Sequence, residues 1–457
     1  MSRQGARSTA VPKFYLNKTI ESFAQRPSTP ISLKHLINFG TIRSKTPAEE
    51  SARILKGGNF LRTELPTRLS HRLRDIQSLP FVVASHPRLE LVYNMYLDAF
   101  EGIRKFPVLK TLEDNDAFCA FMQSTLDTHR SIIPELAIGI AESSPLHLPP
   151  PALDTFMTRM LRSRISRRVI TEQHIALTSQ FRERQAGIGR GWKEGGRVGV
   201  VDTVRPADTV RQCVELVRVR GGPEAGVEVR LEGDLEASFA YIPEHLEFMI
   251  FELLKAAIFA TTSHHGPLES RHHPVVVTMV DGPKELLIRV SDEGGGIEPW
   301  GGLSDPLANP FSSTPSSPPL LVSQRLEVFS FSHMRRLYLH HSSNPPPPAD
   351  PNSSSSSKAK AKVKQVSDEV GIMALRNVGK MAGTVKEQLD YMWGVEEGGE
   401  EMKEAIRGLM DVQMKSGIGL PLAKMFAEYL SGTLQLHTMM GHGSDQLLSI
   451  SKFGHAA

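Results

Sequence analysis

Apolar residues recur at helical spacing through most of residues 22–190. In the segment 61–79 the apolar positions stand three or four residues apart: Leu65, Leu69, Leu73 and Ile76. Pro66 lies near the start of that helix, where proline is tolerated. Further helices are predicted over 89–106, 118–140 and 153–180. Four long helices with short joints indicate an up-down bundle.

The pattern changes after Gly187, where strands begin to alternate with helices. The apolar runs 275–280 and 285–290 flank Asp281-Gly282-Pro283-Lys284 and predict a β-hairpin. A helix over 246–260 has its core stripe at Leu246, Ile250, Leu253, Ala257 and Ala260. The chain is therefore expected to be α+β, with a four-helix bundle followed by an α/β sandwich.

The same helix carries a second set of residues on one face, away from the core stripe: Glu252, Lys255, Ala256 and Phe259. A carboxylate and an ammonium on that face can serve a phosphate site, one orienting or deprotonating a hydroxyl and the other stabilising phosphate charge. For this helix alone, a solvated Glu–Lys pair is the favoured explanation.

Two glycine-rich segments follow. A strand runs into Ser291-Asp292-Glu293-Gly294-Gly295-Gly296, which puts Asp292 at a pocket floor, where it can accept a hydrogen bond from an adenine amine. Gly294 and Gly296 let the backbone approach the base. A glycine-rich turn after an edge strand is the simpler alternative.

The last motif supplies backbone amides for phosphates through Gly417, Ile418, Gly419 and Leu420, just before a helix over 422–430. Gly441-His442-Gly443-Ser444-Asp445 follows shortly after. Each segment alone is weak evidence. The three motifs in this order, each with the right secondary structure, indicate an ATP site.

The bundle region carries further stretches that are more specific. They are Ser32–Gly40, Glu64–Arg72, Arg162–Arg168 with Gln173-His174, Tyr241-Ile242-Pro243 and Ala427–Gly432. With the three motifs, these residues resemble the mitochondrial 2-oxoacid dehydrogenase kinases, the group that phosphorylates pyruvate or branched-chain 2-oxoacid dehydrogenase. The resemblance covers nearly the whole chain except the N-terminal tail and an insertion at 343–365.

The resemblance implies a Bergerat-type ATP site that uses ATP and Mg²⁺ to phosphorylate serine on the decarboxylase component, without a phosphohistidine. It implies Glu252 as general base with Lys255 beside it, and Asp292 as the adenine reader. Gly294, Gly296, Gly417, Ile418, Gly419 and Leu420 would line the nucleotide, and Ser312 and Ser313, after Phe311, would meet phosphate. It further implies a homodimer, a lipoyl-bearing partner and the mitochondrial matrix.

Two positions depart from the family pattern. The family helix carries a metal-binding Asn and, three residues later, an Arg, where this chain has Ala256 and Phe259. Mg²⁺ takes oxygen ligands, and neither side chain supplies one. Two functions therefore stay open: an active serine kinase, and a pseudokinase that acts as a nucleotide-binding scaffold or as the partner of an active kinase. Pyruvate and branched-chain complexes both remain possible targets.

The chain has 457 residues and an ordinary composition. Its net charge of +3 is too small to indicate a nucleic-acid partner. The two cysteines fit no zinc or redox spacing, and no apolar run approaches the length of a membrane span. The basic residues before Glu21 suit a transit peptide or a disordered tail over 1–20. A bundle domain over 21–186 and a kinase domain over 187–457 are expected to follow. The low-complexity residues 343–365 would form a disordered insertion.

Overall fold

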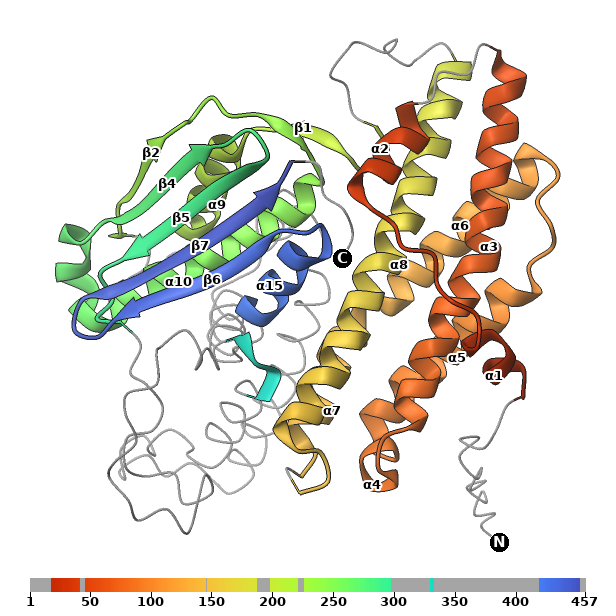
Figure 1. The fold of residues 1–457 in the computed structure, drawn as a ribbon, viewed down its shortest axis with the longest axis horizontal. Coiled ribbons are helices and arrows are strands. Elements are labelled where there is room, and N and C mark those ends of the chain that lie inside the picture. The colour runs from red at the N-terminus through yellow and green to blue at the C-terminus, as the bar shows by residue number, and fades with distance from the viewer. Residues whose placement is uncertain are drawn as a thin grey trace, which may run out of the picture.

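The computed structural model describes residues 18–41, 46–144, 146–186, 198–220, 226–296, 329–332 and 419–452. Long helices from the first part of the chain lie side by side with a sheet formed by the second part (Figure 1). The expected α+β class, with a helical bundle before a sheet domain, is confirmed.

The bundle is built from helices that begin at well-defined caps. Its elements are α1 (Lys18–Ala24), α2 (Leu33–Thr41), α3 (Pro47–Gln77), α4 (Phe81–Ala84), α5 (Pro87–Lys105), α6 (Leu112–Thr128), η1 (His129–Ser131), α7 (Ile132–Glu142) and α8 (Pro150–Gln185). The Thr46 side chain caps α3, and Thr111 forms a capping box with Asp114 at the start of α6. The apolar stripe of α3, including Leu65, Leu69 and Leu73, is buried as expected.

Two expectations for the bundle are wrong in detail. Pro66 lies well inside α3 rather than near its start, because Thr46 and Pro47 start the helix much earlier. The sequence did not indicate that the helix extends through Gly57 and Gly58, since glycine is a poor helix former. A Cβ at Gly57 would lie 2.9 Å from the Phe39 ring, so packing explains the glycine there.

The helix expected over 118–140 is divided into α6 and α7 by the 3₁₀ turn η1. Pro134 stands in the first turn of α7. A residue without a backbone N–H is tolerated only near a helix start, so the helix is interrupted before Pro134 and begins again.

The sheet of the second part has the strand order β2-β4-β5-β7-β6. Its strands are β2 (Val229–Gly233), β4 (Val275–Asp281), β5 (Glu285–Asp292), β6 (Thr433–Met439) and β7 (Gly443–Ser451), and β1 (Asp202–Val204) pairs separately with β3 (Phe239–Tyr241). β2 runs parallel to β4 and the other neighbours are antiparallel. The predicted hairpin is thus β4–β5.

The helices α9 (Pro206–Arg220), α10 (Pro243–Glu269) and α15 (Gly419–Tyr429) accompany the sheet, with the short turn η3 (Ser270–His272) after α10. α10 packs on β4 and β5, α15 packs on β6 and β7, and α9 lies against α10 (Figure 1). Leu286, Ile288 and Val290 are fully buried beneath them, as the alternation of β5 predicts. None of the described helices is long and apolar enough to cross a bilayer.

Candidate functional site

The helix α10 presents the four residues of the first motif at different depths. Glu252 is only 3% exposed, whereas Phe259 is 38% exposed, and Lys255 and Ala256 are half-buried. The core stripe is buried from Leu246 to Ala257, but Ala260 at its end is half-buried. Glu252 is therefore not on a solvated face, and the alternative of a surface Glu–Lys pair does not fit its burial.

Glu252 is held between two partners. Its Oε2 lies 2.5 Å from Lys255 Nζ. On the other side, a Cβ at Gly419 would lie 1.8 Å from Glu252 Oε2, so the carboxylate fills the space that any larger residue would need. Gly419 is the first residue of α15, and a helix N-terminus stabilises a neighbouring negative charge. The structure thus brings the first and third motifs into contact.

Asp292 lies at the end of β5 and is 7% exposed. Its Oδ1 accepts hydrogen bonds from the Gly294 amide at 2.9 Å and from the Ser444 amide at 3.3 Å. Burial raises the pKa of Asp292 to about 6; the two amide hydrogen bonds oppose this rise and the nearby Asp445 adds to it. A strongly perturbed carboxyl on a glycine-rich turn is typical of a ligand-binding position.

The turn after Asp292 is fixed between α10 and the β6–β7 hairpin. A Cβ at Gly294 would lie 2.6 Å from the Ala260 Cβ. Gly296 has φ +75°, and a Cβ there would lie 2.4 Å from the Met439 carbonyl oxygen. Both glycines are therefore required, because a larger residue would clash with these neighbouring segments.

The contribution of β7 was not predicted. The register of β5 and β7 pairs Asp292 with Ser444, which places the Ser444 amide against the carboxylate. Two residues further along, Gln446 donates from Nε2 to the Leu253 carbonyl of α10 at 3.4 Å. Its Oε1 is buried and has no hydrogen-bond partner among the described residues. The sequence singled out Gly441–Asp445 but assigned it no role, because the pairing joins segments far apart in the chain.

α10 is thus the element that all these segments contact: Gly419 meets it at Glu252, Gln446 at Leu253, and Gly294 at Ala260. Leu420 is half-buried and packs against the core. The remaining predicted site residues, Gly417, Ile418, Ser312 and Ser313, lie outside the described residues, as does the segment 343–365.

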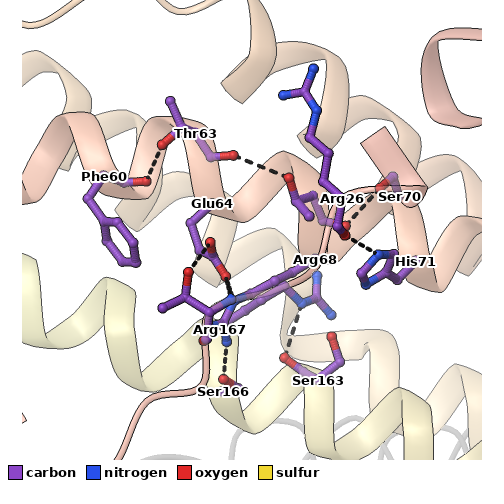
Figure 2. Close-up of polar contacts among 12 residues, drawn as sticks. Arg26, Phe60, Thr63, Glu64, Arg68, Ser70, His71, Ser163, Ser166 and Arg167 are labelled. Carbon is purple, nitrogen blue, oxygen red and sulfur yellow. Dashed lines mark hydrogen bonds and ion pairs between the residues drawn. The ribbon is translucent and has the colours of Figure 1, made fainter. Parts of the chain in front are cut away.

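Two of the distinctive bundle stretches, Glu64–Arg72 and Arg162–Arg168, meet in space at the contact between α3 and α8 (Figure 2). The carboxylate of Glu64 accepts from Arg68 Nε at 2.8 Å, and Arg68 also donates to the Ser166 hydroxyl. Ser166 in turn accepts from the Tyr429 hydroxyl of α15 at 3.3 Å. This chain of hydrogen bonds connects the bundle to the helix that begins at Gly419.

The profile of the family described as "Mitochondrial branched-chain alpha-ketoacid dehydrogenase kinase" matches residues 30–202. The chain is 27% identical to "[Pyruvate dehydrogenase (acetyl-transferring)] kinase 2, mitochondrial" of Saccharomyces cerevisiae, over 96% of this chain and 85% of that protein. It is 24% identical to "[Pyruvate dehydrogenase (acetyl-transferring)] kinase, mitochondrial" of Arabidopsis thaliana, over 93% of this chain and 91% of the relative.

A third relative, "[Pyruvate dehydrogenase (acetyl-transferring)] kinase isozyme 4, mitochondrial" of Mus musculus, is 25% identical over 94% of this chain and 83% of its own length. These matches span both the bundle and the sheet domain, and the family profile covers the bundle stretches 32–40, 64–72 and 162–168. By these matches the chain is similar, along nearly its whole length, to mitochondrial 2-oxoacid dehydrogenase kinases.

Proposed function

We propose that this protein is an ATP-dependent protein-serine kinase that phosphorylates, and so inactivates, the decarboxylase component of a 2-oxoacid dehydrogenase complex in the mitochondrial matrix. The observation that carries the proposal is the set of contacts around α10. Glu252 of α10 contacts Gly419, the first residue of α15, and the turn after Asp292 contacts α10 at Ala260.

The nucleotide fits the residues at the Asp292 end of this set. The Asp292 carboxylate is buried, and both hydrogen bonds described for it go to Oδ1. A carboxylate has four lone-pair sites, so it can still accept from an adenine amine. Gly294 packs on Ala260 and Gly296 packs on the Met439 carbonyl, and these contacts hold the turn, and with it Asp292, in place for the base.

In the proposed reaction Glu252 accepts the proton of the substrate serine hydroxyl. The serine oxygen attacks the γ-phosphorus of ATP, and ADP leaves. Lys255 holds the carboxylate through a 2.5 Å ion pair and can stabilise phosphate charge. Glu252 lies against the first residue of α15, so the base stands close to where helix amides would bind phosphate.

Mg²⁺ fits the protein residues less well. Ala256 supplies no oxygen, and Phe259 places an apolar ring where a cation would help to hold charge. The ion would be held mainly by nucleotide phosphates and water, as magnesium often is. It would supply charge neutralisation on the phosphates.

The same two positions support a second candidate function. A pseudokinase would keep the Asp292 turn and the contact between Glu252 and Gly419 while losing catalysis, and it would act as a nucleotide-binding scaffold or as the partner of an active kinase. Both losses lie on the face of α10 that carries Glu252, whereas the core stripe from Leu246 to Ala257 is intact. This asymmetry is what favours the candidate.

We further propose that the protein forms a homodimer and binds a lipoyl-bearing component of the complex. The names of the relatives point to the pyruvate complex, and the family profile points to the branched-chain complex. Both decarboxylase components therefore belong in the test.

The test measures phosphate transfer from ATP and Mg²⁺ to each purified decarboxylase component. The unmodified protein is compared with Ala256→Asn and with the double variant Ala256→Asn/Phe259→Arg. An active kinase gives robust transfer, and Ala256→Asn changes the rate only modestly, because the site already works without the amide. No transfer by the unmodified protein under any metal contradicts the kinase proposal.

If the protein is a pseudokinase, the double variant gains activity from near zero and Ala256→Asn alone gains little. The two positions lie about one turn apart on one helix face, so their effects are expected to be strongly non-additive. Glu252→Gln in the double variant is the matched control, since it removes the base and keeps the side-chain volume. Activity that survives Glu252→Gln would contradict the assigned base.

A further inference from the structure

A cluster of imidazoles and one carboxylate lies on the outer side of the Asp292 turn. His265, His273 and Glu293 each offer one ligand atom, and these three atoms lie within 4.8 Å of one another. His265 is in the last turn of α10 before Gly266, which has φ +80°. His273 lies between η3 and β4, and Glu293 directly follows β5. Three separate elements therefore bring the ligand atoms together.

The three side chains are already oriented toward each other. His273 Nδ1 lies 2.5 Å from Glu293 Oε2, and His265 Nε2 lies 2.8 Å from the Glu293 carbonyl oxygen. The rings of His265 and His273 stack with their centroids 3.6 Å apart and their planes within 5°. The lone pair of an imidazole nitrogen lies in the ring plane, so one of the two stacked rings has to turn before all three ligands can face one ion.

We propose that His265, His273 and Glu293 form a binding site for a transition-metal ion of the Zn²⁺ class. Two imidazoles and one carboxylate are a donor set that zinc takes, with metal–ligand distances near 2.1 Å and an open fourth position for water. Magnesium prefers oxygen ligands in a strict octahedron. This site is therefore chemically different from any Mg²⁺ position beside Glu252.

The three ligand atoms fit such an ion once one imidazole ring turns out of the stack and one close contact opens. Two ligands of a tetrahedral zinc stand about 3.3 Å apart, so the 2.5 Å contact between His273 and Glu293 has to open slightly. Glu293 is 60% exposed and His273 is 32% exposed in their side chains, which leaves both free to adjust. The ion would join the end of α10 to the residue next to Asp292.

The test uses the full-length protein, stripped with chelator, and titrates ZnCl₂ alone by calorimetry. The proposal expects one zinc ion per chain that His273→Ala and Glu293→Gln each weaken by roughly 100-fold or more, since even outer partners of zinc ligands are worth 10–100-fold. His272→Ala is the matched control, because this neighbouring histidine is outside the cluster and should leave the affinity unchanged. Co²⁺ in place of zinc should give an absorption spectrum in the parent that both ligand variants lose.

The chain has 17 histidines, so zinc could also bind elsewhere. Equal zinc affinity in the parent and both ligand variants, or no binding at all, overturns the proposal. Thermal midpoints without metal check that the variants fold. If His273→Ala does not fold, Glu293→Gln still tests the proposal, because it keeps the size of the side chain. The proposal is independent of kinase activity, because none of these measurements includes a nucleotide.

Discussion

The molecule has two buried polar clusters, one in the bundle and one at the candidate site, and burial shifts the pKa of their ionisable groups in opposite directions. In the bundle, His174 Nε2 lies 2.9 Å from Asn115 Oδ1, and Asn115 Nδ2 donates to the Thr178 hydroxyl at 3.2 Å. Burial lowers the pKa of His174 to about 4. At the site, backbone amides bind the Asp292 carboxylate, and burial raises the pKa of Asp292 to about 6.

The difference indicates what each cluster is for. In the bundle, the side chains of His174, Asn115 and Thr178 bond to one another, and Gly58 packs against them so closely that a Cβ there would lie 2.7 Å from Asn115 Oδ1. At the site, one carboxylate oxygen takes both described amide bonds, which leaves acceptor capacity for a ligand. The first arrangement specifies packing, and the second keeps a buried charge available at a cost in stability.

The largest expected effect is on stability and belongs to the bundle cluster. His174→Ala removes a buried ring and leaves Asn115 Oδ1 without its donor, so the free energy of unfolding should fall by about 3–5 kcal/mol. Chemical denaturation measures this fall, and a titration with ADP should show unchanged affinity in the folded variant. A variant that loses ADP affinity while keeping its stability would reverse the assignment of roles.

The next largest effect is on ligand binding and belongs to the site cluster. Asp292→Ala should weaken ADP binding by at least about 10–100-fold, since the loss of a buried hydrogen-bond acceptor costs about 1–3 kcal/mol. Asp292→Asn is the matched variant: its Oδ1 can keep the two amide bonds, while its amide nitrogen would oppose the adenine amine. Calorimetry that shows full ADP affinity in Asp292→Ala would remove Asp292 from the site.

Acid should act on the two clusters with opposite signs. The pKa of His174 is lower in the folded protein than its ordinary 6.5, so stability is lost as the pH falls from about 6.5 toward 4. The pKa of Asp292 is higher than its ordinary 3.8, so the folded state binds more protons between these values, and stability is gained as the pH falls from about 6.

The measurement compares unfolding free energies near pH 7.5 and pH 4.5 for the parent, His174→Gln and Asp292→Asn. The parent should lose about 1–3 kcal/mol relative to His174→Gln on acidification and gain about as much relative to Asp292→Asn. The buried His129 and His245, whose pKa values burial also lowers, cancel in both differences because all three proteins contain them. Equal signs for the two differences would contradict the comparison.

The sequence predicted features that depend on neighbouring residues. The β4–β5 hairpin and the core stripe of α10 from Leu246 to Ala257 follow from local alternation and helical spacing, and the structure confirms them. The start of α3 and the division between α6 and α7 were wrong, because a cap and a proline outweighed the apolar period.

The burial of Glu252 and the hydrogen bond from Ser444 to Asp292 could not be read from the sequence. Both depend on segments distant in the chain: α15 packs its first residue against Glu252, and β7 pairs with β5 in a fixed register. The histidines at 265 and 273 gave no signal either, because a helix end and two strand ends converge only in the fold. Contacts between segments far apart in the chain were therefore the ones that the sequence could not predict, whatever the residue types involved.

The smallest expected effect concerns a buried atom in each cluster that has no hydrogen-bond partner among the described residues: His174 Nδ1 in the bundle and Gln446 Oε1 at the site. Gln446→Leu removes that oxygen and a long 3.4 Å bond to the Leu253 carbonyl, so its stability should change by less than about 0.5 kcal/mol. Asn115→Leu is the matched change in the bundle and should cost about 1–3 kcal/mol, because it leaves the His174 donor unpaired. Denaturation midpoints of the two variants give the comparison. If Gln446→Leu lowered the free energy of unfolding as much as Asn115→Leu, Gln446 would be a structural residue like those of the bundle cluster. The unused acceptor capacity would then no longer distinguish the site cluster from the bundle cluster.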